Sequence, residues 1–138
     1  DTVSPYGICA VCKMPSLGFQ MPKGNALLLD GVSDPGNLGT ILRSAAACDF
    51  CDVYLFDTAD VFSPKVVRAT LGGLFRVRLH EVENKPSTPV LLVAGNEAHG
   101  VREILKRAAK NTYSLPMKNE IESLNVAVAT AVSMYQTL

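Results

Sequence analysis

Three short stretches of the sequence carry polar side chains in the segment that follows an apolar, strand-like run. They hold Asn37 and Arg43 in the first stretch, Asn96 and Glu97 in the second, and Ser123 and Asn125 in the third. In an open α/β sheet, ligands bind beyond the carboxyl ends of the strands, so the three stretches would converge on one site. Amide, hydroxyl, carboxylate and guanidinium groups beside exposed backbone can bind and orient a polar ligand.

Each of these side chains has a simpler explanation when it is taken alone. Asn37 and Ser123 could cap the helices that follow them, and Arg43 could extend into solvent from an alanine-rich helix. Glu97 could favour the positive N-terminus of the next helix. Only the joint occurrence at three successive strand ends favours a binding site.

The glycines of these loops match no standard phosphate-binding fingerprint. The sequence has neither G-x-G-x-x-G after a strand nor G-x-x-x-x-G-K-[ST], which argues against a standard dinucleotide or triphosphate site. No nucleophile elbow accompanies His80 or His99, so a Ser-His-Asp hydrolase is not indicated.

The four cysteines form two C-x-x-C pairs, Cys9 with Cys12 and Cys48 with Cys51. Such pairs can hold zinc, but here 35 residues separate them instead of about 15–20, and no glycine-rich knuckle flanks either pair. We therefore expect no metal site, and reduced, buried thiols in a cytoplasmic protein. A zinc-bound interaction domain is the alternative that these pairs would support.

Length and composition indicate one globular domain. The chain has 138 residues, 48% of them hydrophobic, and no apolar run approaches the ~18–20 residues that cross a bilayer. Thirteen basic and thirteen acidic side chains cancel, so any site for a polyanion must be local. The chain begins at Asp1 without Met and without a secretory signal, so we expect a fragment from which an N-terminal partner domain is absent.

Apolar runs separated by Gly, Pro and Asn predict alternating strands and helices. Strands are predicted at Ile8–Lys13, Ala26–Asp30, Asp52–Phe56, Arg76–Val82, Val90–Ala94 and Tyr113–Leu115. Helices are predicted at Leu38–Cys48 with Asn37 as its cap, from Ser63-Pro64 to Gly72-Gly73, at Val101–Ala109 with a solvated basic face that includes Arg102, and at Ser123–Leu138. This order predicts a single α/β domain over residues 1–138 with a mainly parallel sheet.

One connection conflicts with a fully parallel sheet. Only Glu83–Pro89 joins two strands that should be parallel, whereas a crossover with its helix needs at least about 10–12 residues. Either these two strands pair as a hairpin, or an element is absent from the chain here.

Three segments together carry a resemblance to a known family. Asp34-Pro35-Gly36-Asn37-Leu38-Gly39-Thr40-Ile41-Leu42-Arg43, Leu92-Val93-Ala94-Gly95-Asn96-Glu97-Ala98-His99-Gly100-Val101 and Leu115-Pro116-Met117 through Ser123-Leu124-Asn125-Val126-Ala127 resemble, in order and spacing, the three motifs of the SpoU branch of the SPOUT RNA methyltransferases. The likeness covers nearly the whole chain from about Ala26.

The resemblance implies a sheet whose C-terminal part is tied in a deep trefoil knot, an exception to the rule that folds are not knotted. It implies a homodimer that binds S-adenosylmethionine in the knot and methylates a ribose 2′-hydroxyl of ribosomal or transfer RNA. A separate N-terminal RNA-recognition domain is common in such proteins. The different-class alternative is a catalytically silent, knotted module that binds RNA or cofactor.

The resemblance also assigns roles to residues. Gly95, Asn96, Leu115, Met117 and Leu124 would hold the cofactor, and Asn37, Arg43, Glu97, Ser123 and Asn125 would form the catalytic set. Because a guanidinium is hard to use as a base, Arg43 would grip the adjacent phosphate and stabilise negative charge on the attacking oxygen. Ser123 and Asn125 would orient the hydroxyl and the loop.

The chain departs from the family pattern in three places. Ala98 stands where glycine is common, and Ala127 stands where serine is common. The Glu83–Pro89 join is shorter than in relatives, which usually carry a further helix and strand there. Outside the motifs, Lys65, Arg68, Arg76 and Arg78 could form a local phosphate-binding patch.

Overall fold

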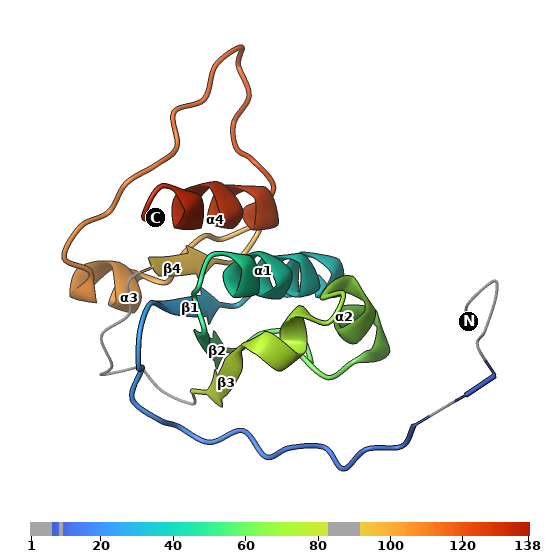
Figure 1. Ribbon diagram of the computed structural model, residues 1–138. Helices are drawn as coiled ribbons and strands as arrows, with labels where there is room; N and C mark the ends of the chain where they lie inside the picture. The colour runs from blue at the N-terminus through green and yellow to red at the C-terminus, as the bar shows by residue number, and fades with distance from the viewer. Residues whose placement is uncertain (1–6, 9, 83–91) are drawn as a thin grey trace.

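Four strands form one fully parallel sheet in the order β3-β2-β1-β4 (Figure 1). The computed structural model describes residues 7, 8, 10–82 and 92–138. The strands are β1 (Ala26–Asp30), β2 (Asp52–Phe56), β3 (Arg78–Glu81) and β4 (Leu92–Gly95). The helices are α1 (Pro35–Ala47), α2 (Pro64–Ala69), η1 (Gly73–Arg76, 3-10), α3 (Glu103–Ala108) and α4 (Val126–Tyr135). The predicted parallel α/β sheet is confirmed.

Strand β1 lies inside the sheet, between β2 and β4, and helices cover both of its faces. All five of its residues are buried. Leu27 and Leu29 face a core formed with α1 and α4, whereas Ala26 and Leu28 face a smaller cluster that includes Leu105 of α3. An uninterrupted apolar run suits such a position, since each fully buried leucine contributes roughly 1.5–3 kcal/mol.

The caps that begin the helices differ in part from those expected. Ser63 caps α2 with Pro64 following it, as predicted. Asp34, and not Asn37, caps α1: its Oδ1 accepts a hydrogen bond from the Asn37 N–H at 2.7 Å, and Pro35 occupies the first helical turn. The prediction for Asn37 was wrong because Asp-Pro is the stronger start signal. Its side chain is consequently available to other partners.

Two predicted strands are absent from the described residues, and three helices are shorter than predicted. Around Ile8–Lys13 no strand forms, with Ile8 89% and Val11 97% exposed. Tyr113–Leu115 belongs to an irregular segment that projects beyond α4 in Figure 1. Helix α2 ends at Ala69 instead of Gly72-Gly73. Helix α3 covers Glu103–Ala108 instead of Val101–Ala109, and α4 covers Val126–Tyr135 instead of Ser123–Leu138.

The strand order decides one question that the sequence left open. Strands β3 and β4 lie at opposite edges of the sheet, so they do not pair as a hairpin. The residues of the Glu83–Pro89 join lie outside the described part of the chain. The two strands that it joins are parallel and are separated by β2 and β1.

A buried carboxylate, Asp52, ties the N-terminal segment to the sheet. It accepts hydrogen bonds from the Lys23 N–H at 2.8 Å, from Arg78 Nε and Nη2 at 2.8 and 2.7 Å, and pairs with His80 Nε2 at 3.0 Å. The hydrogen bonds from Arg78 hold the pKa of the Asp52 carboxyl well below its usual range despite its burial. The guanidinium of Arg78 is thus paired with Asp52 and does not contribute to the predicted phosphate patch.

The described cysteines show no metal-binding arrangement. Cys48 is buried in the core, where burial raises the pKa of its thiol, and Cys12 is exposed. Cys9 lies outside the described residues. Among those that the structure describes, no group of three or more His, Cys, Asp or Glu side chains could hold a metal ion, and no helix is long and apolar enough to cross a membrane.

Replacing Asp52 by Asn should destabilise the fold by about 3 kcal/mol, because it leaves Arg78 and His80 beside a neutral group. The low folded-state pKa of Asp52 predicts a second effect. The stability that it contributes is complete above the unfolded-state pKa and is lost as the pH falls below about 5. Urea unfolding from pH 7 to pH 3 measures both.

Glu81→Gln is the matched control, because Glu81 is an exposed acid on β3. It should change the free energy of unfolding by less than about 0.5 kcal/mol. If Asp52→Asn retained the wild-type stability and acid dependence, the role assigned to this carboxylate would be wrong.

Candidate functional site

The loops after β1 and β4 meet because the two strands pair in register to their last residues. Asp30 pairs with Gly95, so the chain leaves both strands at the same level of the sheet. Gly95 is required here: a Cβ atom at this position would lie 2.3 Å from the Gly100 carbonyl carbon and from the Val101 nitrogen. The loop of β4 can therefore fold back on its own strand end.

The carboxylate of Glu97 joins these two loops. Its oxygens accept hydrogen bonds from Ser33 N–H at 3.3 Å, Ser33 Oγ at 3.2 Å, Asp34 N–H at 3.3 Å and Asn37 Nδ2 at 3.1 Å. Burial raises the pKa of Glu97, but these hydrogen bonds, with one from its own backbone, outweigh it and lower the pKa below the ordinary value. Glu97 is therefore ionised at neutral pH and acts as an acceptor.

Asn125 connects the third predicted stretch to the same cluster. Its Nδ2 donates to Asn37 Oδ1 at 2.9 Å, while its Oδ1 accepts from the N–H groups of Ala127 and Val128. Asn125, and not Ser123, therefore caps α4. A continuous chain of hydrogen bonds runs from Glu97 through Asn37 to the start of α4.

Asn96 stabilises the loop from inside. Its Nδ2 donates to the Gly31 carbonyl at 2.7 Å, and its Oδ1 accepts from the N–H groups of Ala98 and His99. Gly100 has φ +69°, whereas Ala98 is not among the residues with positive φ. The alanine at position 98 is therefore accommodated without backbone strain.

Arg102 holds the other end of this loop, although the sequence predicted a solvated side chain. Its backbone N–H donates to Asp30 Oδ2 at 2.7 Å, and its Nε lies 2.9 Å from Asp30 Oδ1. The guanidinium also pairs with Asp57 and lies 4.3 Å from the centre of the Phe56 ring. A buried acid at the end of a central strand needs a cation, which explains why Arg102 turns inward.

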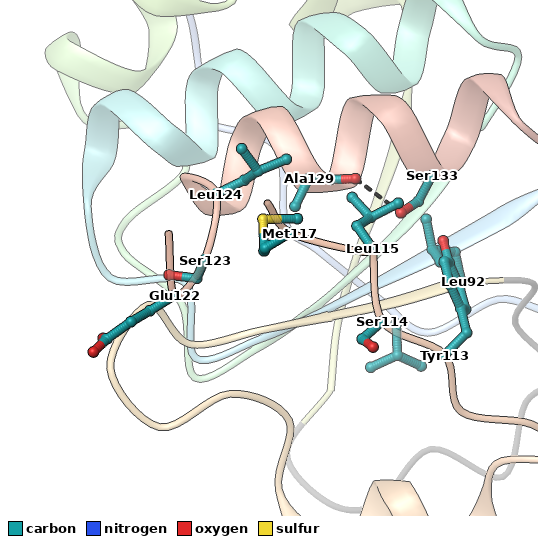
Figure 2. Close-up of a pocket in the computed structure, with 11 residues that line it drawn as sticks. Leu92, Tyr113, Ser114, Leu115, Met117, Glu122, Ser123, Leu124, Ala129 and Ser133 are labelled. Carbon is teal, nitrogen blue, oxygen red and sulfur yellow. Dashed lines mark hydrogen bonds between the residues drawn. The ribbon is translucent and has the colours of Figure 1, made fainter. Parts of the chain in front are cut away.

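A cavity of about 280 Å³ lies between β4, the irregular segment 113–124 and α4. Figure 2 shows Leu115, Met117 and Leu124 gathered beside α4, with the Ser133 hydroxyl bonded to the Ala129 carbonyl. The lining is mostly apolar with a few hydroxyls, as in many small-molecule sites. The lining residues are Leu92, Val93, Tyr113, Ser114, Leu115, Met117, Glu122, Ser123, Leu124, Ala129 and Ser133.

The predicted site residues fall into two neighbouring groups. Asn37, Glu97 and Asn125 form the hydrogen-bonded cluster, with Asn96 and Gly95 shaping its loop. Leu115, Met117, Ser123 and Leu124 line the cavity. Arg43 is exposed on α1, about 9 Å of helix rise from Asn37, and its side chain makes no hydrogen bond or ion pair with any residue that the structure describes.

Sequence reasoning missed several residues of this region. Ser33, Asp34 and Arg102 organise the loops, while Tyr113, Ser114 and Ser133 add polar atoms to the cavity. The Asp-Pro pair and the acid at the end of β1 were available signals. The cavity residues carried no such signal, because they meet only in the folded chain.

Comparison with known proteins places this geometry in a family. The model of the SpoU rRNA methylase family matches residues 24–88 and 84–135, which together are most of the chain. The chain belongs to this family. The matched range includes all three loops of the site and the whole of the described sheet.

Two relatives and one solved structure illustrate the likeness. RlmP of Bacillus subtilis, a 23S rRNA guanosine 2′-O-methyltransferase, is 34% identical over 98% of this chain and 66% of its own length. RlmB of Xanthomonas axonopodis, also a 23S rRNA guanosine 2′-O-methyltransferase, is 31% identical over 81% of this chain and 57% of its own. The SpoU methyltransferase AviRb of Streptomyces viridochromogenes, solved with AdoMet, has a TM-score of 0.78 at 26% identity, covering 90% of this chain and 62% of its own.

The chain thus spans less than two thirds of the length of these relatives. The alignment with RlmP runs over 166 positions although the chain has 138 residues, so it contains gaps on the side of this chain. The family model likewise matches in two pieces that meet at residues 84–88. The break in the family match agrees with residues being absent between β3 and β4.

Asn125→Ala should lower the free energy of unfolding by about 1 kcal/mol, because α4 loses its N-terminal cap. Asn125→Asp keeps an oxygen that accepts from the N–H groups of Ala127 and Val128 but loses the donor to Asn37. It should remain within about 0.5 kcal/mol of the wild type, since a hydrogen bond between exposed groups contributes little. Chemical denaturation of both variants measures the difference, and equal losses would contradict the capping role.

Proposed function

We propose that this chain transfers a methyl group from S-adenosylmethionine to a ribose 2′-hydroxyl of ribosomal or transfer RNA. The observation that carries the proposal is the hydrogen-bonded cluster of Asn37, Glu97 and Asn125 beside a cavity lined by Leu115, Met117 and Leu124. Support comes from the relatives named as 2′-O-methyltransferases and from the related structures solved with AdoMet.

The residues of the cavity fit such a cofactor. Leu115, Leu124 and the Met117 side chain offer an apolar surface for an adenine ring, and the irregular backbone of residues 113–124 leaves N–H and carbonyl groups free of helix or sheet pairing. Glu122 places an acid at the rim, where it favours a cationic group. When bound, the cofactor supplies a methyl group on a positively charged sulfur.

The transfer forms a bond between the ribose oxygen and the methyl carbon and breaks the carbon–sulfur bond, and the hydroxyl proton leaves to solvent or a base. The hydroxyl must be aligned, because in-line geometry contributes much of the rate. We assign alignment to Ser123 and Asn125, which stand between the cavity and the polar cluster. Arg43 would grip the adjacent phosphate and stabilise negative charge on the attacking oxygen.

Glu97 acts in this proposal as a positioning group. Its low pKa and its donors from Ser33, Asp34 and Asn37 make it a poor proton acceptor, because protonation would weaken those hydrogen bonds. It keeps Asn37 oriented, and Asn37 in turn holds Asn125. Glu97 therefore positions the other members of the catalytic set and does not accept the hydroxyl proton.

We also propose a homodimer. Helix α4 is apolar on all sides, yet Val128, Val132 and Tyr135 form a stripe that stays partly exposed. The stretch 123–138 contains no charged residue. A second copy of the same helix would cover this stripe and bring two sites together.

The remaining proposals rest on the family likeness. The C-terminal part, residues 92–138, would be tied in a deep trefoil knot, and the active protein would be cytoplasmic, where its RNA substrates are found. The catalytic domain would cover residues 1–138, with RNA recognition aided by a separate N-terminal domain. A catalytically silent module that binds RNA or cofactor is the second candidate, and the intact set of polar site residues argues against it.

Arg43→Ala should reduce the rate of methyl transfer to total RNA by about 10²- to 10³-fold, the usual effect of removing one charge-stabilising donor. Cofactor affinity should be unchanged, because Arg43 does not line the cavity. Arg43→Lys, which keeps the charge but not the two-pronged geometry, should recover only part of the rate. Full activity of Arg43→Ala in a folded protein would refute the assignment, and wild-type protein that binds the cofactor without methylating any RNA would favour the silent module.

Ala129→Leu should weaken S-adenosylmethionine binding at least tenfold, because the larger side chain fills part of a 280 Å³ cavity. Ala108→Leu is the matched control, since it makes the same substitution at an exposed alanine of α3 that does not line the cavity. Isothermal titration calorimetry with both variants makes the comparison. Equal affinity for the cofactor in the two variants would mean that it binds elsewhere.

A further inference from the structure

The stretch from Val61 to His80 concentrates positive charge in a chain whose net charge is zero. It contains Lys65, Arg68, Arg76 and Arg78 and no acidic residue. This stretch forms α2 and η1, which lie against α1, and then β3, which lies beside β2 in Figure 1. A local positive potential on this side of the molecule follows.

Only some of these cations are available to a ligand. Arg78 is held by Asp52, and Lys65 lies 3.7 Å from Asp34. Arg68 and Arg76 are exposed and make no ion pair or hydrogen bond through their side chains with any described residue. Both therefore keep their full capacity to bind anions.

Two large apolar side chains lie exposed between these arginines in the sequence. Phe75 is 85% and Leu71 73% exposed, although the turns that present them are held by backbone hydrogen bonds from Gly73 N–H to the Thr70 carbonyl and from Phe75 N–H to the Gly72 carbonyl. An ordered turn that exposes an aromatic ring indicates a binding surface and not a packing defect.

Helix α1 brings Arg43 to the same surface. A Cβ atom at Gly73 would lie 3.0 Å from the Arg43 Cα, so η1 sits directly against the helix at that residue. The absence of a side chain at position 73 permits this contact. The residue assigned to the reaction thus lies against the 3-10 helix that also carries Phe75 and Arg76.

Charge identifies the occupant of this surface. A second copy of the chain would bring the arginines of both copies together, and like charges oppose such an interface. The uncharged stripe on α4 is the better surface for self-association. Arginines around an exposed aromatic ring are instead the combination by which proteins hold single-stranded nucleic acid, with bases stacked on the ring and phosphates on the guanidinium groups.

We propose that Arg43, Arg68, Leu71, Phe75 and Arg76 form a binding surface for single-stranded RNA, with Phe75 stacking on a base next to the methylated nucleotide. This inference rests on the proposed function, because Arg43 belongs both to this surface and to the catalytic set. Phe75 is a substrate-positioning residue in this scheme. Its ring fixes the RNA so that the ribose reaches the cavity.

Fluorescence anisotropy with a labelled single-stranded RNA oligonucleotide tests the surface. Phe75→Ala should weaken binding about 5- to 150-fold, the usual loss for one stacked base, whereas Phe75→Tyr should retain it. Arg76→Ala should lower the slope of log K against log salt by about 0.7. Ile104→Ala, which removes an exposed apolar side chain from α3, should bind as the wild type does.

Calorimetry with S-adenosylmethionine on the same variants separates this inference from the proposed function. Unchanged RNA affinity in Phe75→Ala would overturn the surface, even if cofactor binding and methyl transfer are intact. Dissociation of a dimer by Phe75→Ala would also overturn it, because the ring would then contact a second copy. RNA binding that depends on Phe75 in a protein unable to bind the cofactor would support the surface and refute the methyltransferase.

Discussion

The carboxylate of Glu97 is the group on which the arrangement of the site depends. It lies in the loop after β4 and accepts hydrogen bonds from Ser33 and Asp34 in the loop after β1 and from the Asn37 side chain in α1. Asn37 in turn accepts a hydrogen bond from Asn125. Three segments far apart in the sequence therefore share one network of hydrogen bonds. Such a network favours this arrangement of the loops, because its hydrogen bonds form together only when all three segments are in place.

Two further constraints fix where this network sits. The register of β1 with β4 brings both loops to the same level of the sheet, and Arg102 anchors the far end of the second loop to buried Asp30. At the opposite end of the strands, Asp52 does the same for the N-terminal segment through the Lys23 N–H. Buried acids at strand ends thus organise both ends of the sheet.

The parts of the fold that the sequence could predict are those that local signals control. The apolar run of β1, the Ser63-Pro64 start of α2 and the turn glycines each specify their own element. The failures arose where two local signals competed or where a distant partner decides. Asp34 and Asn37 could both cap α1, and Pro35 settled the choice. Arg102 looked like a solvated residue until the burial of Asp30 was known, and Tyr113–Leu115 forms no strand because pairing depends on a neighbour elsewhere in the chain.

The central position of β1 has a consequence for how the protein folds. Its neighbour β2 follows it closely in the chain, so β1, α1 and β2 can associate through local contacts. Its other neighbour, β4, comes much later, since Leu27 pairs with Leu92. Closing so long a loop is slow, and during synthesis the edge of the sheet beside β1 cannot form until β4 has left the ribosome. Glu97 and Asn125 lie still later in the chain, so the polar network is among the last structures to assemble, on a sheet that is already in place.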